Sequence, residues 1–115
     1  MQVVTLVLNK TELLEALLEE LYKAGVHGAT VLESTGMARV LDASGDDLPM
    51  FGALRQLLDP QRTSSKTVVM VLRDEQVEGV RAVIRRVTGG LNHPDTGILF
   101  TVPALTMEGL EDDPE

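Results

Sequence analysis

Few side chains in this sequence could carry out chemistry, and those that could do so lie in loops. The two histidines, His27 and His93, each follow a helix-forming segment, and neither has a second ligand at helical spacing. As metal ligands they would need each other or a neighbouring subunit. The chain has no cysteine and lacks the short motifs of serine hydrolases, phosphate-binding loops and dinucleotide-binding folds. These residues predict a protein that is not an enzyme.

Two glycine-rich loops are the remaining candidates for a site. Residues 33–39 leave the second predicted strand, and residues 88–97 connect the second predicted helix to the last strand. Backbone N–H groups in such turns can hold an anion, and Arg39 is the one Lys or Arg in the two loops. The same glycines are also an ordinary means of ending helices. An anionic ligand at this site should therefore depend on Arg39.

The elements that position these loops occur twice. Residues 3–32 and residues 66–103 each read as strand, helix and strand, with helices at 11–24 and about 75–88. A duplicated unit of this kind predicts an α+β, ferredoxin-like split βαβ fold in the order βαββαβ. The expected sheet is four-stranded and antiparallel, with two helices on one face and a long insertion between the second and third strands.

The predicted helices carry clear apolar stripes and end signals. A capping-box-like start is expected at Asn9 and Glu12, and Gly25 should end the first helix. The stripe of the first helix is Leu14, Leu17, Leu18 and Leu21, and that of the second is Val80, Val83, Ile84 and Val87. The basic residues Arg81, Arg85 and Arg86 lie off the second stripe, which predicts a solvated face.

The strands are apolar on both faces. Residues 68–72 form an unbroken apolar run, and residues 3–8 nearly do. A strand with one exposed face alternates apolar and polar residues, so a continuous run indicates burial on both sides. Two helices cover only one face of a four-stranded sheet, and the pattern therefore predicts a homo-oligomer in which another subunit covers the second face.

The connection at 36–65 has no strand-like pattern. Within it, residues 49–58 read as a short helix that ends before Pro60, with apolar positions suited to burial on one side. This helix is expected either to plug an edge or an intersubunit groove, or to dock a ligand or partner. The flanking residues 41–48 and 59–65 are expected to be mobile.

Composition limits the class of protein. With 115 residues and 43% hydrophobic residues, the chain should form a single domain over residues 1–108, followed by an acidic tail at 109–115. A net charge of −8 argues against nucleic acid as a partner. The first ten residues read as a strand, which predicts neither a signal peptide nor membrane insertion. The absence of cysteine fits a reducing cytoplasm.

A family resemblance is carried by the order of the elements and by four segments, residues 28–31, 35–39, 74–78 and 97–103. Over residues 2–108 the chain resembles the PII nitrogen-regulatory signalling family. Members of that family are trimers that bind ATP or ADP between subunits and grip partner proteins with a protruding loop. The resemblance therefore implies a nitrogen-regulatory signalling protein that is a homotrimer. It also implies a regulated protein target, contacted through loop residues 37–65.

The resemblance also implies a set of nucleotide-binding residues: Thr30, Gly36, Met37, Arg39, Thr88, Gly89 and Gly90. The chain departs from the family where phosphates are neutralised. Gly90 and Ile98 stand where the family has lysines, and nothing basic follows Arg86. The only tyrosine, Tyr22, lies in the first helix rather than in the protruding loop. An AMP- or ADP-type nucleotide, or none, is therefore expected in preference to ATP.

Two other classes remain open. A metal-handling or structural trimer like the related CutA proteins would require His27 and His93 to converge across subunits. Small acylphosphatases with a split βαβ fold use an arginine and an asparagine near the first strand. Asn9 is present here, but no arginine precedes Arg39.

Overall fold

The structure is a computed structural model that describes residues 1–43 and 64–109. Its elements in chain order are β1 (Gln2–Leu8), a 3₁₀ turn η1 (Thr11–Leu13), α1 (Leu14–Lys23), β2 (Thr30–Ser34), α2 (Met37–Ala43), β3 (Ser65–Leu72), α4 (Asp74–Thr88) and β4 (Gly97–Pro103). The predicted duplication of strand, helix and strand is present, and β4 has the bounds that the sequence predicts.

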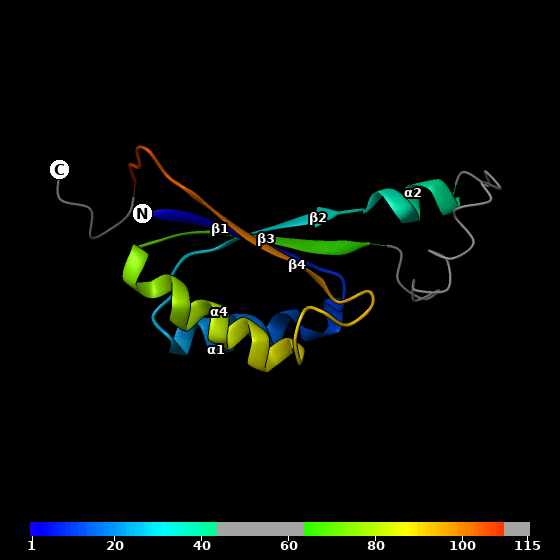
Figure 1. Ribbon diagram of the computed structural model, residues 1–115, viewed down its shortest axis with the longest axis horizontal. Helices are drawn as coiled ribbons and strands as arrows, with labels where there is room; N and C mark the ends of the chain where they lie inside the picture. The colour runs from blue at the N-terminus through cyan, green and yellow to red at the C-terminus, as the bar shows by residue number, and fades with distance from the viewer. Residues whose placement is uncertain (44–63, 110–115) are drawn as a thin grey trace.

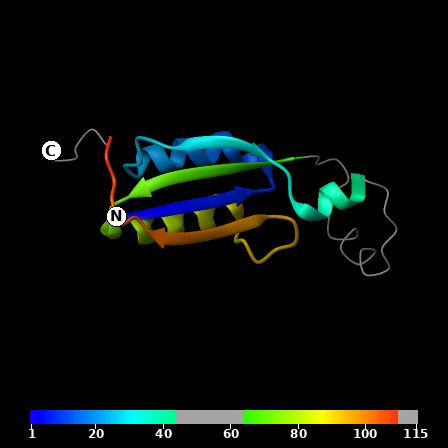
Figure 2. The same cartoon turned by 90° about the horizontal axis from the view of Figure 1, so that it is seen from above.

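The four strands form one antiparallel sheet in the order β2-β3-β1-β4. Helices α1 and α4 lie side by side on one face of it (Figure 1), and the view from above shows the strands with both helices behind them (Figure 2). The protein is therefore α+β with an antiparallel four-stranded sheet, an arrangement compatible with a ferredoxin-like fold.

The core lies between the sheet and these two helices. Alternate residues of β1, namely Val4, Leu6 and Leu8, are completely buried, because successive side chains of a strand point to opposite faces. The predicted stripes of both helices meet them. The buried helix residues are Leu17, Leu21, Val77, Val80, Val83 and Ile84, and Leu14, Leu18 and Val87 pack at their margin.

The start of the first helix differs from the sequence prediction. Its N-cap is Lys10, with no side-chain cap, so the capping box predicted at Asn9 and Glu12 is wrong. The chain enters α1 through η1, and the Asn9 N–H donates to the Thr96 carbonyl at 2.9 Å, which ties residue 9 to the segment before β4. The predicted stop is present, with Gly25 at φ +99° after α1.

Helix α4 is capped by a side chain at its start. The Gln76 side chain accepts from the Arg73 N–H at 3.0 Å, and the Gln76 N–H donates to the Arg73 carbonyl at 3.0 Å. Near the same end, the Met1 amino group lies 3.1 Å from Asp74 Oδ1. A hydrogen bond from this amino group, and then its charge, lower the pKa of the Asp74 carboxyl.

In the part of the chain that the structure describes, no helix lies on the second face of the sheet (Figure 1). Residues paired across strands share a face, so the register identifies its side chains. We call them the open face: Val3, Thr5, Val7, Thr30, Leu32, Ser34, Ser65, Thr67, Val69, Val71, Ile98, Phe100 and Val102. At its edges Leu32, Ile98 and Phe100 are 50%, 62% and 48% exposed. The strands therefore carry apolar side chains on both faces, and among residues 1–43 and 64–109 helices cover only the first face.

The segment after β2 corrects the sequence analysis. Residues 37–43 form α2, where no element was predicted, and the stretch expected to be mobile from residue 41 begins inside this helix. The helix predicted at 49–58, most of the flanking residues and most of the acidic tail lie outside the described residues.

Candidate functional site

The candidate site lies at one end of the sheet. Helix α2 projects beyond the sheet at the end where the loop between α4 and β4 lies, as both ribbon views show (Figures 1 and 2). The two segments are distant in the chain, and they contain residues of both predicted glycine-rich loops: α2 begins within residues 33–39, and the α4–β4 loop lies within residues 88–97.

An ion pair joins the two segments. Arg39 on α2 donates from Nη2 to Asp95 Oδ2 at 2.6 Å, across the gap between α2 and the loop. The two side chains are only 10% and 8% exposed. A charge-assisted hydrogen bond so well shielded from water is among the stronger polar contacts in proteins. Arg39, the cation on which an anionic ligand was predicted to depend, is therefore already engaged by a carboxylate.

The start of the α4–β4 loop is fixed by two glycines and by the hydroxyl group of Thr88. Gly89 and Gly90 adopt φ of +77° and +103°, which ends α4 and turns the chain. The Thr88 hydroxyl is buried, donates to the Ile84 carbonyl at 2.7 Å and accepts from the Gly90 N–H at 3.3 Å. In this chain Thr88 therefore shapes the loop and keeps its hydroxyl within it.

At its far end the loop leads into β4 through a close backbone approach. Asp95 has φ +55°, in the left-handed region that Asp tolerates better than most residues. Thr96 is 1% exposed, and its carbonyl accepts from the Asn9 N–H. A Cβ on Gly97 would lie 2.2 Å from the Val7 carbonyl oxygen. These contacts fix where Asp95 presents its carboxylate.

The remaining predicted residues of the first loop begin α2. The Gly36 carbonyl accepts from the N–H groups of Arg39 and Val40 at 3.2 and 3.1 Å. Met37, the first residue of the helix, is 74% exposed. Gly36 and Met37 therefore lie at the start of α2, next to Arg39 in the chain.

Thr30 does not join the others within one chain. It lies at the beginning of β2, opposite Val69, whereas Arg39 follows the end of that strand at Ser34. The strand alone separates the two ends by about 13 Å. Thr30 is exposed and belongs to the open face, so within one chain it lies apart from the contact between Arg39 and Asp95.

Asp95 is the residue that the sequence analysis missed. It is the only carboxylate in residues 88–97, and it stands between Pro94 and Thr96 in a loop otherwise made of small and neutral residues. An acidic residue in a loop predicted to bind anions is the signal that could have identified it.

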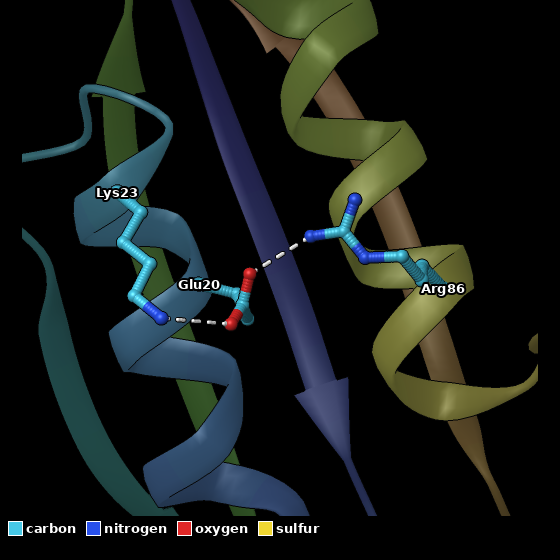
Figure 3. Close-up of polar contacts among 3 residues, drawn as sticks. All are labelled: Glu20, Lys23 and Arg86. Carbon is cyan, nitrogen blue, oxygen red and sulfur yellow. Dashed lines mark hydrogen bonds and ion pairs between the residues drawn. The ribbon is translucent and has the colours of Figure 1, made fainter.

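The predicted basic face of α4 is divided between two roles. Arg86 donates to Glu20 on α1 at 2.9 Å, and Lys23 donates to the other oxygen of the same carboxylate at 3.4 Å (Figure 3). Arg81 pairs with Glu78 along the helix. Arg81 and Arg85 also line a cleft of about 690 Å³ between α4 and β4. The side chains of Arg81 and Arg86 are 43% and 63% exposed, so the solvated face that the sequence predicted is present and carries ion pairs.

The histidines lie apart. The His27 ring packs against Tyr22 at a centroid distance of 5.1 Å, and His93 lies against Gly90. The segments that carry them are at opposite ends of the helix layer (Figure 1). Over residues 1–43 and 64–109, no three His, Cys, Asp or Glu side chains are grouped so that they could hold a metal ion.

Comparison with models of protein families found no family that matches, and comparison with curated proteins found no significant match. In the part of the chain that the structure describes, no helix has both the length and the apolar character needed to cross a bilayer.

Proposed function

We propose that this protein is a divergent PII-like regulatory protein with a ferredoxin-like fold, which forms a homotrimer and binds a small anionic effector between subunits. The effector is of the AMP or ADP type, and the response passes to a protein target through the loop at 37–65. The observation that carries the proposal is the contact of Arg39 with the loop between α4 and β4. It brings together the two segments that the family resemblance assigns to the nucleotide.

The open face supports assembly. Its thirteen positions hold no charged side chain, and Leu32, Ile98, Phe100 and Val102 are each about half exposed in the single chain. Large uncharged patches of this kind are typical of interaction surfaces rather than of surfaces that face water. A closed trimer would bury the open face of all three subunits at once.

The place of Thr30 supports a site between subunits. This residue is on the open face, whereas Arg39 and the α4–β4 loop are at the end of the sheet. A cleft formed where the open face of one subunit meets the α2 end of the next would combine them, and one chain alone does not.

Assembly is tested by size-exclusion chromatography with light scattering. We expect a mass three times the 12.5 kDa of the chain at micromolar concentration. A monomeric mass over the same range would contradict both the burial argument and the proposed site between subunits.

Effector binding is tested by calorimetry with AMP, ADP and ATP. We expect AMP or ADP to bind more tightly than ATP, and Arg39→Ala to weaken binding about 10- to 100-fold, as expected for the loss of a hydrogen bond to a charged group. Arg86→Ala is the matched control, because Arg86 is exposed and pairs with Glu20 on the helix layer. Low-micromolar ATP binding that survives Arg39→Ala would show that the site is wrongly assigned.

A further inference from the structure

The ion pair at the candidate site raises the question of what a ligand must do to reach Arg39. Arg39 Nη2 and Asp95 Oδ2 are 2.6 Å apart, and both side chains are at least 90% buried. Charges so shielded are screened less by salt than charges on the surface. A phosphate that binds Arg39 must therefore displace the Asp95 carboxylate or share the guanidinium with it.

We infer that Asp95 is a specificity-determining residue: its carboxylate takes the place at Arg39 that a phosphate oxygen would take, and it thereby limits the negative charge of the ligand. This inference rests on the proposed function, since it concerns the ligand of the same site. The inference adds to the proposed function the residue that selects between nucleotides.

Both routes to Arg39 weaken the binding of a phosphate, and the shared route weakens it more with each added phosphate. A phosphate group carries nearly two negative charges at neutral pH. If it shares the guanidinium, it lies next to the Asp95 carboxylate, and each further phosphate of ADP or ATP adds repulsion. If it displaces Asp95, the carboxylate loses its guanidinium partner in a site with little water, and that loss is costly. Asp95 therefore favours a monophosphate over a triphosphate.

The backbone keeps Asp95 in this role. Its φ of +55°, the hydrogen bond from Asn9 to the Thr96 carbonyl and the tight approach of Gly97 to β1 leave the loop little freedom to move the carboxylate away. Arg39 is on α2, at the root of the long segment. A ligand that breaks the ion pair therefore also breaks a contact that holds α2 to the rest of the protein.

The test removes the charge and keeps the shape. Asp95→Asn is nearly isosteric, and Asn also tolerates the left-handed conformation. Calorimetric titrations of the full-length protein with AMP, ADP, ATP and inorganic pyrophosphate are compared with wild type. We expect ATP to bind about 10- to 100-fold more tightly to Asp95→Asn and AMP to change much less, so that the preference shifts toward ATP. Adding Arg39→Ala should abolish the gain.

Two further variants make the readout specific. Glu20→Gln removes the same charge from the contact between α1 and α4, away from the site, and should leave all affinities as in wild type. Asp95→Ser is a second neutral variant, which gives the same comparison if the amide disturbs the loop.

The outcomes separate this inference from the proposed function. If wild type binds nucleotides and the ATP-to-AMP preference does not change in either neutral variant, the inference is overturned and the function stands. If no nucleotide binds, but pyrophosphate binds Asp95→Asn at least about tenfold more tightly than wild type and only with Arg39 present, Asp95 still guards an anion site and the nucleotide function is wrong. If Asp95→Asn binds none of the four probes more tightly than wild type does, the inference is overturned.

Discussion

Replacing Phe100 by aspartate is expected to convert the proposed trimer into single chains. Phe100 lies in the middle of β4, opposite Thr5, on the open face. In an oligomer that covers this face, each copy of the variant would bury a carboxylate among uncharged side chains. Burying an unpaired charge costs at least several kcal/mol per copy, and this cost is paid once for every subunit. Light scattering should therefore show the mass of one chain at micromolar concentration.

Leu105→Asp is the matched control for this experiment. Leu105 is 95% exposed and follows β4 outside the sheet, so the same apolar-to-acidic change should leave the mass unchanged. Circular dichroism should show that the Phe100→Asp chain keeps its secondary structure, because Phe100 points away from the core. If Phe100→Asp keeps the wild-type mass, the open face is not the assembly surface.

Replacing Gly97 by alanine is expected to destabilise the fold by about 3 kcal/mol. The new Cβ would lie 2.2 Å from the Val7 carbonyl oxygen, on a backbone with φ +154° that other residues rarely adopt. Backbone strain and overpacking each cost about 1–3 kcal/mol, and the structure can relax only by moving β4 away from β1. The midpoint of urea unfolding measures the loss.

Gly79→Ala is expected to change the free energy of unfolding in the opposite direction. Gly79 is inside α4, and a Cβ there would meet nothing within 4 Å. Alanine favours helix over glycine by about 1 kcal/mol, so this variant should be more stable than wild type. Equal midpoints for Gly97→Ala and wild type would show that the approach of β4 to β1 is not as tight as the structure has it.

The parts of the fold that the sequence predicts are those with periodic burial. Leu17 and Leu21 on α1, and Val80 and Ile84 on α4, are buried as their spacing indicates. The strands were predicted by unbroken apolar runs, and the register shows the reason: Val4, Leu6 and Leu8 face the helices while Val3, Thr5 and Val7 line the open face. The local hydrophobic pattern was sufficient because alternate residues of a strand face opposite sides, so an unbroken apolar run supplies apolar side chains to both faces of the sheet.

The parts that the sequence did not predict depend on contacts distant in the chain. Just before the first helical turn, Asn9 forms a hydrogen bond with Thr96, and Arg39 on α2 pairs with Asp95. No local signal at Asn9 or at residues 37–43 reports a partner more than fifty residues away. For the site, the sequence identified the cation and both loops, but it took the three-dimensional structure to reveal the anion between them.

The central position of β1 in the sheet has a consequence for how the chain acquires its structure during synthesis. Both neighbours of β1, the strands β3 and β4, are made after it, beginning at Ser65 and Gly97. A nascent chain that has reached only residue 43 therefore contains neither of the strands that pair with β1 in the folded sheet. Contacts that close such long loops slow folding, although their entropic cost grows only with the logarithm of loop length. Lengthening or shortening residues 44–63 should thus alter the folding rate and the final stability only slightly, whereas a ribosome that pauses before Gly97 holds a chain whose first strand still lacks one edge.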